Sequence, residues 1–398
     1  MKKPQRTHII YACTLVFSLL FLLVGNRVAQ GGGRIFGAAV EEEIFRAQVL
    51  RVISEDKDTY DTAGAGGFTV TTITFEARAL SGSRKGKTLR CVQEIDNMFA
   101  LQSPKVQEGD TILLDVLDEE GAQGTAHAGD RYLFFDFVRT SPLLMLALVF
   151  ALLVVFFGRK KGFDTVLSLV LTVLAIFTVL VPAVLTGRNI YLWSLLICVF
   201  IVMTNLLLVQ GGSAKSLTAA LGCVGGVLAS GLIMLLMNRP MHITGLLDEE
   251  SIFLLQLNPN NPINIKATVF CMILIGSVGA LMDVSMSIAS ALQEIREKEP
   301  SLPAKELMRS GFNIGKDMIG TMANTLVLAY IGGSMSIILL MISYSANLTQ
   351  MLNKELIAVE ILQSLAGSMS VVIAIPLTSL ICSVFYRGGK KTLRVESE

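Results

Sequence analysis

The chain has 398 residues, of which 52% are hydrophobic and 16% are charged, and its mean hydropathy is +0.61. Soluble domains carry roughly 25% charged residues, so this composition excludes a chain made only of water-soluble domains. The formal net charge of +1 excludes the overall basic field that nucleic-acid-binding proteins use, and we expect no nucleic-acid partner.

Eight apolar segments predict transmembrane α-helices, which makes the lipid bilayer the first expected partner. The first segment, residues 9–25, follows three basic residues, a pattern typical of a signal peptide or of an uncleaved signal anchor. We favour the anchor because Arg27 stands where cleavage after Ala29 would need a small residue. The other seven segments are 141–158, 163–186, 190–210, 217–237, 267–289, 318–342 and 361–386.

The Lys and Arg residues indicate how these helices are oriented. With a cytoplasmic N-terminus, the cytoplasmic segments hold 16 basic residues and the short outer loops hold four, while no predicted span contains one. This bias follows the positive-inside rule and predicts that both termini are cytoplasmic. The chain then divides into an N-terminal transmembrane anchor (1–26), an extracytoplasmic domain (27–140), a seven-helix transmembrane domain (141–386) and a cytoplasmic tail (387–398).

The extracytoplasmic segment has the pattern of a small all-β domain. Alternating apolar and polar residues predict strands at 44–54, 68–80, 87–94, 111–118 and 131–138, and turn residues separate them. Five short strands indicate a barrel or a sandwich, with an oligonucleotide/oligosaccharide-binding type of barrel as one hypothesis. Residues 41–138 contain 18 acidic and 10 basic residues, which disfavours anionic polymers as ligands.

The cysteines and histidines predict neither a disulfide nor a metal site. Cys91 is the only cysteine of the β domain, and the other five lie in predicted spans, so no disulfide is expected within this domain. His8, His127 and His242 are scattered, and no His/Cys cluster has metal-ligand spacing. The motifs of zinc metalloproteases and phosphate loops are also absent. We therefore expect no metal, no cofactor, no catalytic residues and no enzymatic activity.

Asp283 is the leading candidate for a functional residue because an ionisable side chain at membrane depth is costly. It lies about six residues, roughly 9 Å, inside the cytoplasmic end of the predicted helix 267–289. Helical periodicity places small and polar residues on the same side as Asp283. These residues are Gly276, Gly279, Ala280, Ser287 and Ser290. We expect this stripe to face protein.

The following predicted helix has a similar polar line. Asp317, Gly320, Thr321, Asn324 and Gly332 fall within about 60° of one line along the helix, and Asn324 reaches about the same depth as Asp283. We predict that Asp283 meets Thr321 and Asn324 in the bundle interior as a proton or transport site, with Asp317 at the cytoplasmic mouth. The structural alternative is that Asp283 accepts hydrogen bonds there and never titrates.

Several small residues predict close helix packing. Gly222 and Gly226 form a G-x-x-x-G pattern, and Gly276, Gly279, Gly320 and Gly367 lie on the small-residue lines of their helices. The last predicted helix has a comparable stripe with Glu360 at its outer mouth, made of Gln363, Gly367, Ser370 and Ala374. In the outer loop, the apolar segment 246–257 predicts a short helix at the membrane surface.

Two strings resemble the YibE/F family of bacterial multispanning membrane proteins. They are GALMDVSMSIAS at 279–290 and GKDMIGTMANTL at 315–326, the latter continuing through Ala329 and Tyr330. The resemblance covers roughly residues 140–386 and implies the bacterial plasma membrane, without an established activity. A weaker similarity to the proton-driven SecD/SecF export permeases rests on the order of spans and outer module and on an Asp late in a helix. The chain departs from that pattern because Asp283 lies 12 residues before Ile295 and two extra spans are present.

These observations leave two hypotheses for function. The first is a permease-like protein with a buried-carboxylate site among the predicted helices 267–289, 318–342 and 361–386. The second is a non-transporting membrane scaffold or envelope-complex component, in which the acidic β domain binds an envelope protein.

Overall fold

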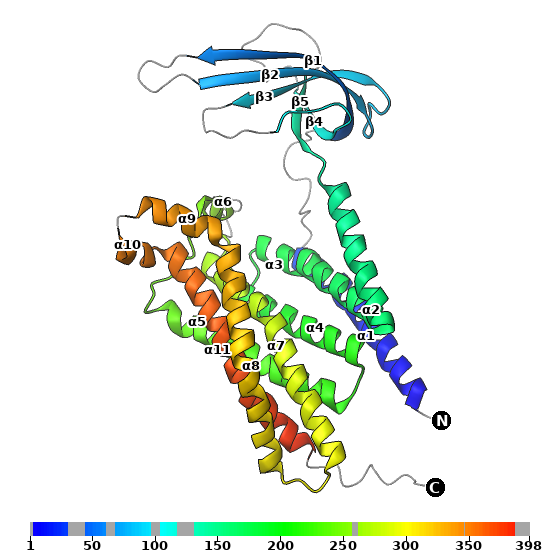
Figure 1. Cartoon of the computed structure of the whole chain (residues 1–398), viewed down its shortest axis with the longest axis vertical. Coiled ribbons are helices and arrows are strands. Elements are labelled where there is room, and N and C mark those ends of the chain that lie inside the picture. Colours follow the sequence, from blue (N-terminus) through cyan, green and yellow to red (C-terminus); the bar gives the residue numbers. More distant parts are fainter. Residues whose placement is uncertain are drawn as a thin grey trace. The chain divides into compact units, whose positions relative to one another are not determined.

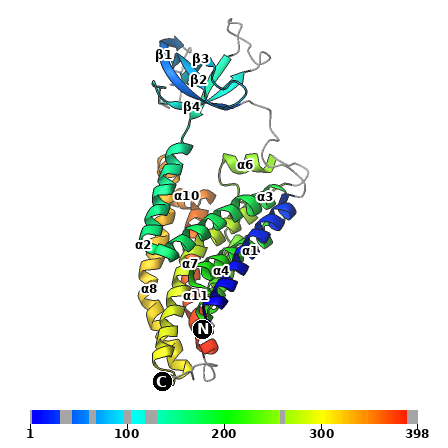
Figure 2. The ribbon, with the colours of Figure 1, turned by 90° about the vertical axis from the view of Figure 1, so that its right-hand side faces the viewer.

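The computed structural model describes residues 3–30, 44–60, 68–96, 104–117, 131–256, 262–345 and 347–386. The chain forms two compact units. The β unit is Phe36–Leu153, and the helical unit combines Met1–Ile35 with Val154–Glu398. Figures 1 and 2 show both units.

The β unit contains a five-stranded closed barrel. Its strands are β1 (Phe45–Tyr60), β2 (Phe68–Ala79), β3 (Thr88–Asp96), β4 (Thr111–Leu117) and β5 (Arg131–Phe137), in the order β1-β2-β3-β5-β4. The pairs are antiparallel except for β3 with β5, which is parallel. This order is that of the oligonucleotide/oligosaccharide-binding type of barrel. The predicted small β domain is thus confirmed, whereas its predicted turn residues at 64–67 and 121–129 lie outside the described residues.

Alternation along the strands builds the barrel core. Phe45, Ala47 and Val49 on β1 and Phe75 on β2 are at most 3% exposed, as expected when every second side chain points inward. One polar side chain joins them, because Gln93 is buried and uses both ends of its amide. It donates to the Pro104 carbonyl and accepts from the Val106 amide, both at 2.9 Å. A buried amide that is fully hydrogen-bonded fixes this loop without an unsatisfied group.

The helical unit is built from long helices joined by short connections. In chain order they are α1 (Lys3–Gln30), α2 (Thr140–Ala175), the π-helical turn η2 (Ile176–Leu180), α3 (Val181–Leu185), α4 (Ile190–Gln210), α5 (Ala214–Asn238), α6 (Glu249–Gln256), α7 (Ile265–Lys298), α8 (Ala304–Gly333), α9 (Met335–Tyr344), α10 (Leu348–Leu352) and α11 (Glu355–Phe385). The short helix α6 lies within the predicted segment 246–257. The start of α2 belongs to the β unit.

Six helices of the described residues are long and apolar enough to cross a membrane, or seven if α8 and α9 count as one span. The predicted number of eight is therefore not confirmed; one span fewer comes from α2, and the count of six also comes from the break between α8 and α9. Together α2, η2 and α3 form one stretch of 46 residues, Thr140–Leu185, where the sequence predicted two helices. Arg159 breaks this stretch with φ 50° and ψ −126°. A Cβ at Gly162 would overlap the Val154 carbonyl, so the chain turns back closely at this kink.

The predicted helix 318–342 is also different in the structure. It starts earlier, at Ala304, and is broken between α8 and α9, whose axes differ by 62°. The paired glycines Gly332 and Gly333 stand at the break, where low helix propensity favours an interruption.

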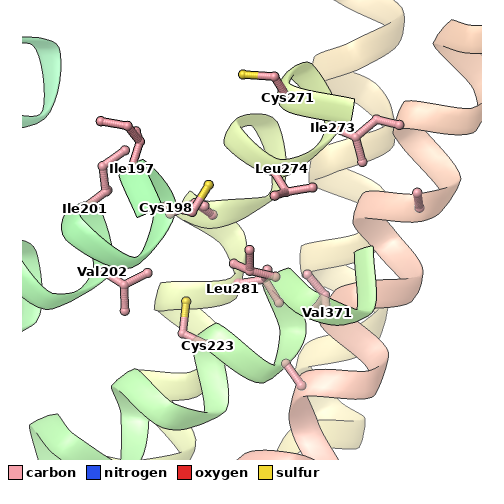
Figure 3. Packing of buried hydrophobic residues seen from close by; sticks show 14 of the residues in the cluster. Ile197, Cys198, Ile201, Val202, Cys223, Cys271, Ile273, Leu274, Leu281 and Val371 are labelled. Carbon is pink, nitrogen blue, oxygen red and sulfur yellow. The ribbon is translucent and has the colours of Figure 1, made fainter. Parts of the chain in front are cut away.

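The core of the helical unit lies among α4, α5, α7 and α11, and the last three pack through small residues. A Cβ at Gly222 would overlap the Thr378 side chain, and one at Gly226 would overlap Leu281. Figure 3 shows Cys223, Leu281 and Val371 from the three helices gathered in this core. Small residues allow such close approach of helix backbones, and hydroxyl pairs add interhelical contacts. The hydroxyl oxygens of Ser285 and Thr378 lie 3.3 Å apart, and those of Ser230 and Ser277 lie 3.4 Å apart.

Candidate functional site

The structure places Asp283 on the exposed face of α7. Gly276, Gly279 and Ser287 on the same line are also exposed, whereas Leu281 and Ser285 on the opposite side are buried against α5 and α11. Within the described part of the chain, α8 reaches this stripe at Gly276 through Tyr330, and the rest of the exposed residues have no such contact, so the expectation that the stripe faces protein stays a prediction. Both sides of α7 carry small residues, and the side with Leu281 and Ser285 is the one that packs.

The predicted partners of Asp283 on α8 are exposed as well. Thr321 donates its hydroxyl hydrogen bond to the Met318 carbonyl at 3.0 Å, within its own helix. Asn324 and Asp317 lie on the same exposed face. No hydrogen bond joins Asp283 to Thr321 or Asn324 in the described part of the chain. The structure thus brings these residues to uncovered faces of two helices rather than into the bundle interior.

The glycines of these two faces divide into packed and open positions. At Gly276 of α7 a Cβ would overlap the Tyr330 hydroxyl of α8. At Gly367, which belongs to α11, a Cβ would lie 2.8 Å from Leu326 of α8. At Gly279 and Gly320 nothing lies within 4 Å of the Cβ position. α7 and α8 therefore touch near Gly276 and leave free space beside Gly279 and Gly320.

Glu360, for which no role was predicted, lies at the break between α8 and α9. Glu360 of α11 accepts a hydrogen bond of 2.5 Å from the Ser334 hydroxyl, and Ser334 is the residue between the two helices. Interrupted membrane helices are common at the binding sites of transporters because their ends present polar groups at membrane depth. The Gly332–Gly333 pair is the sequence feature from which the break between α8 and α9 could have been predicted.

Asp164 is a second acidic residue that sequence reasoning missed. It is 7% exposed in the second half of α2 and accepts a hydrogen bond of 3.0 Å from the Tyr11 hydroxyl of α1. The sequence feature that could have indicated this contact is a single carboxylate three residues after the basic residues 159–161. The bond joins α1 to the second half of α2.

The described residues contain no group of three or more His, Cys, Asp or Glu side chains able to hold a metal ion. His127 lies outside the described residues.

Comparison with known protein families gives a match over residues 146–388, more than half of the chain, to the family described as YibE/F-like protein. The chain belongs to the YibE/F-like family. Both strings that suggested the family, 279–290 and 315–326, lie inside the match. No curated protein and no solved structure gives a match. The family and the apolar helices of this YibE/F-like chain agree with a multi-pass membrane protein, while its similarity to SecD/SecF permeases stays a prediction.

Proposed function

We propose that this YibE/F-like chain is a permease-like protein of the bacterial plasma membrane, without enzymatic activity or cofactor. Its polar faces on α7 and α8 line a hydrated path for protons or small cations. One observation carries the proposal: Asp283, Thr321 and Asn324 are exposed on helices of membrane-spanning length, beside open space at Gly279 and Gly320. A charged residue at the centre of a lipid-facing helix costs about 2.5–3.5 kcal/mol or more, so water or protein covers such a face.

In this proposal Asp283 is the carrier and binds the proton or cation. Thr321 and Asn324 supply hydrogen-bonding oxygens from α8, and Asp317 attracts cations at the cytoplasmic mouth. The bend beside Gly333 lets α8 and α9 move relative to each other, because backbone flexibility is greatest at a glycine pair. Such a movement closes or opens the polar faces to one side of the membrane.

The proposed topology has eight crossings, with α2 crossing twice and both termini in the cytoplasm. A straight helix of 46 residues would be roughly 69 Å long, more than twice the hydrocarbon thickness of about 30 Å. The kink at Arg159 divides it into two segments of suitable length, and in this proposed topology Lys160 lies at the cytoplasmic surface. A cysteine at position 160 should react with a membrane-impermeant maleimide in inside-out vesicles only. Labelling in right-side-out vesicles would contradict this topology.

Proteoliposomes with an imposed pH gradient test the transport role. Asp283→Asn should reduce proton or cation flux by about tenfold or more, because the amide cannot carry the charge. Asp248→Asn is the matched control, since Asp248 loses the same charge but lies before α6, where it accepts a hydrogen bond from the Ser251 amide. Equal flux for wild type and Asp283→Asn would overturn the proposal.

A second candidate is the non-transporting scaffold, and the β unit favours it. This unit has its own apolar core and closed barrel, and the sequence of residues 41–138, with 18 acidic and 10 basic residues, differs from that of an anion-binding module. If this role is correct, residues 41–138 alone bind a purified envelope protein while Asp283 variants leave the cellular phenotype unchanged.

A further inference from the structure

A cleft of about 220 Å³ lies where α8 ends, between α8, α9 and α11. Most of its wall is apolar, with side chains such as Val327, Ile338 and Ile357. The polar groups are few and lie together: Glu360 and Ser364 come from α11, and Tyr330 and Ser334 come from α8 and the break. This combination of apolar walls and a few converging polar groups is typical of small-molecule sites.

Glu360 is the only charged side chain of this cleft among the described residues. Its hydrogen bond from Ser334 satisfies one carboxylate oxygen and leaves the other free to accept. No Lys or Arg of the described residues forms a salt bridge with it. A carboxylate in apolar surroundings without a cation is unfavourable, and it attracts a positively charged ligand.

One further polar group of the cleft wall lacks a partner. The Tyr330 hydroxyl is buried over Gly276 and has no hydrogen bond within the described part of the chain. Buried polar groups of folded proteins normally have partners, so this hydroxyl is free to take part in binding a ligand or water.

We propose that this cleft binds a small hydrophobic ammonium ion. The ammonium N–H groups donate to Glu360 and to the Tyr330 oxygen, and the apolar part of the ligand contacts the side chains of Val327 and Ile357. An anion would meet the Glu360 charge, and a purely apolar ligand would leave that charge unpaired. A bare metal ion would find one carboxylate, which is too few ligands for a stable site.

The inference deepens the proposed transport function by naming a substrate class. Only the transport of this ligand rests on that function; its binding to the cleft does not. Binding is measured without flux. If the ligand binds but no flux is observed, the permease function is refuted and the binding site is still supported.

The test uses the full-length protein in lipid nanodiscs, with benzylammonium as the probe and benzyl alcohol as its neutral analogue. By calorimetry, benzylammonium should bind wild type about tenfold or more tightly than benzyl alcohol does, and Glu360→Gln should remove this difference. Glu355→Gln is the matched control. Glu355 lies on the same helix but accepts hydrogen bonds from Thr244 and Gly245 instead of lining the cleft, so binding should be unchanged.

Ile331→Trp gives a second test that leaves Glu360 in place. Ile331 lines the cleft and is 42% exposed, so a larger side chain fits at its rim and should block both ligands. Three results would overturn the proposal: no binding to wild type, equal binding of the two probes, or unchanged benzylammonium binding in Glu360→Gln.

Discussion

Replacing Gly222 by alanine should destabilise the helical unit although alanine is the better helix former. The added Cβ would overlap the Thr378 hydroxyl and would lie 3.1 Å from the Thr378 Cα, which is backbone and cannot rotate away. Overpacking of this kind costs about 1–3 kcal/mol, and displacing Thr378 also weakens its hydrogen bond to Ser285, worth about 0.5–1.5 kcal/mol. The gain in helix propensity returns roughly 0.5–1 kcal/mol. The expected net loss is about 1–3 kcal/mol of unfolding free energy.

The measurement is the free energy of unfolding from a denaturant titration in mixed detergent micelles. Gly279→Ala is the control because nothing lies within 4 Å of its Cβ position on the open side of α7. It should leave stability unchanged or raise it by up to about 1 kcal/mol. If Gly222→Ala is as stable as wild type, the close contact of α5 with α11 is not as described. If Gly279→Ala is the destabilised variant, the face we describe as open is packed against protein.

Two further predictions concern single side chains. Burial raises the pKa of the Cys91 thiol to about 12, so only about one thiol in 10⁴ is ionised near pH 8. Native residues 41–138 should therefore resist alkylation by iodoacetamide until they are denatured, and rapid labelling of the native domain would refute this. Tyr11→Phe should lower the unfolding free energy by about 1–3 kcal/mol, because it leaves the buried Asp164 without its donor. Tyr344→Phe, at a side chain that is 79% exposed, should have no effect in the same titration.

The β unit was predicted well because one face of each strand is buried in the barrel. Its period-two pattern defined all five strands, and the first residue of β2 and of β4 was predicted correctly. A water-exposed face must be polar, so the alternation carries the information about which residues point inward. The main difference is β1, which continues to Tyr60, beyond the predicted end at residue 54.

The same rule does not work for the packed side of a membrane helix. Lipid is as apolar as the protein core, so hydrophobicity does not distinguish the two sides of α7. Both sides offer small and hydroxyl residues: Ser277 and Ser285 on one, Gly279 and Ser287 on the other. The carboxylate of Asp283 suggested burial within the chain, and the structure places it on the opposite side from the core. Composition predicted that these helices exist, but α7 and α8 extend beyond the predicted bounds, and the choice of packed face depends on contacts with helices far away in the sequence.

The two polar regions of the helical unit meet at one side chain. Tyr330 lines the cleft that contains Glu360, and its hydroxyl lies over Gly276, the first small residue of the α7 line that leads to Asp283. Seven residues separate Gly276 from Asp283, a helical rise of about 10 Å. A ligand or proton at Glu360 is therefore one helical segment away from the second carboxylate, with the open position at Gly279 between them. If the permease proposal is correct, Glu360 and Asp283 are successive binding sites along one transport path. Tyr330 then controls the passage of the proton or cation between them.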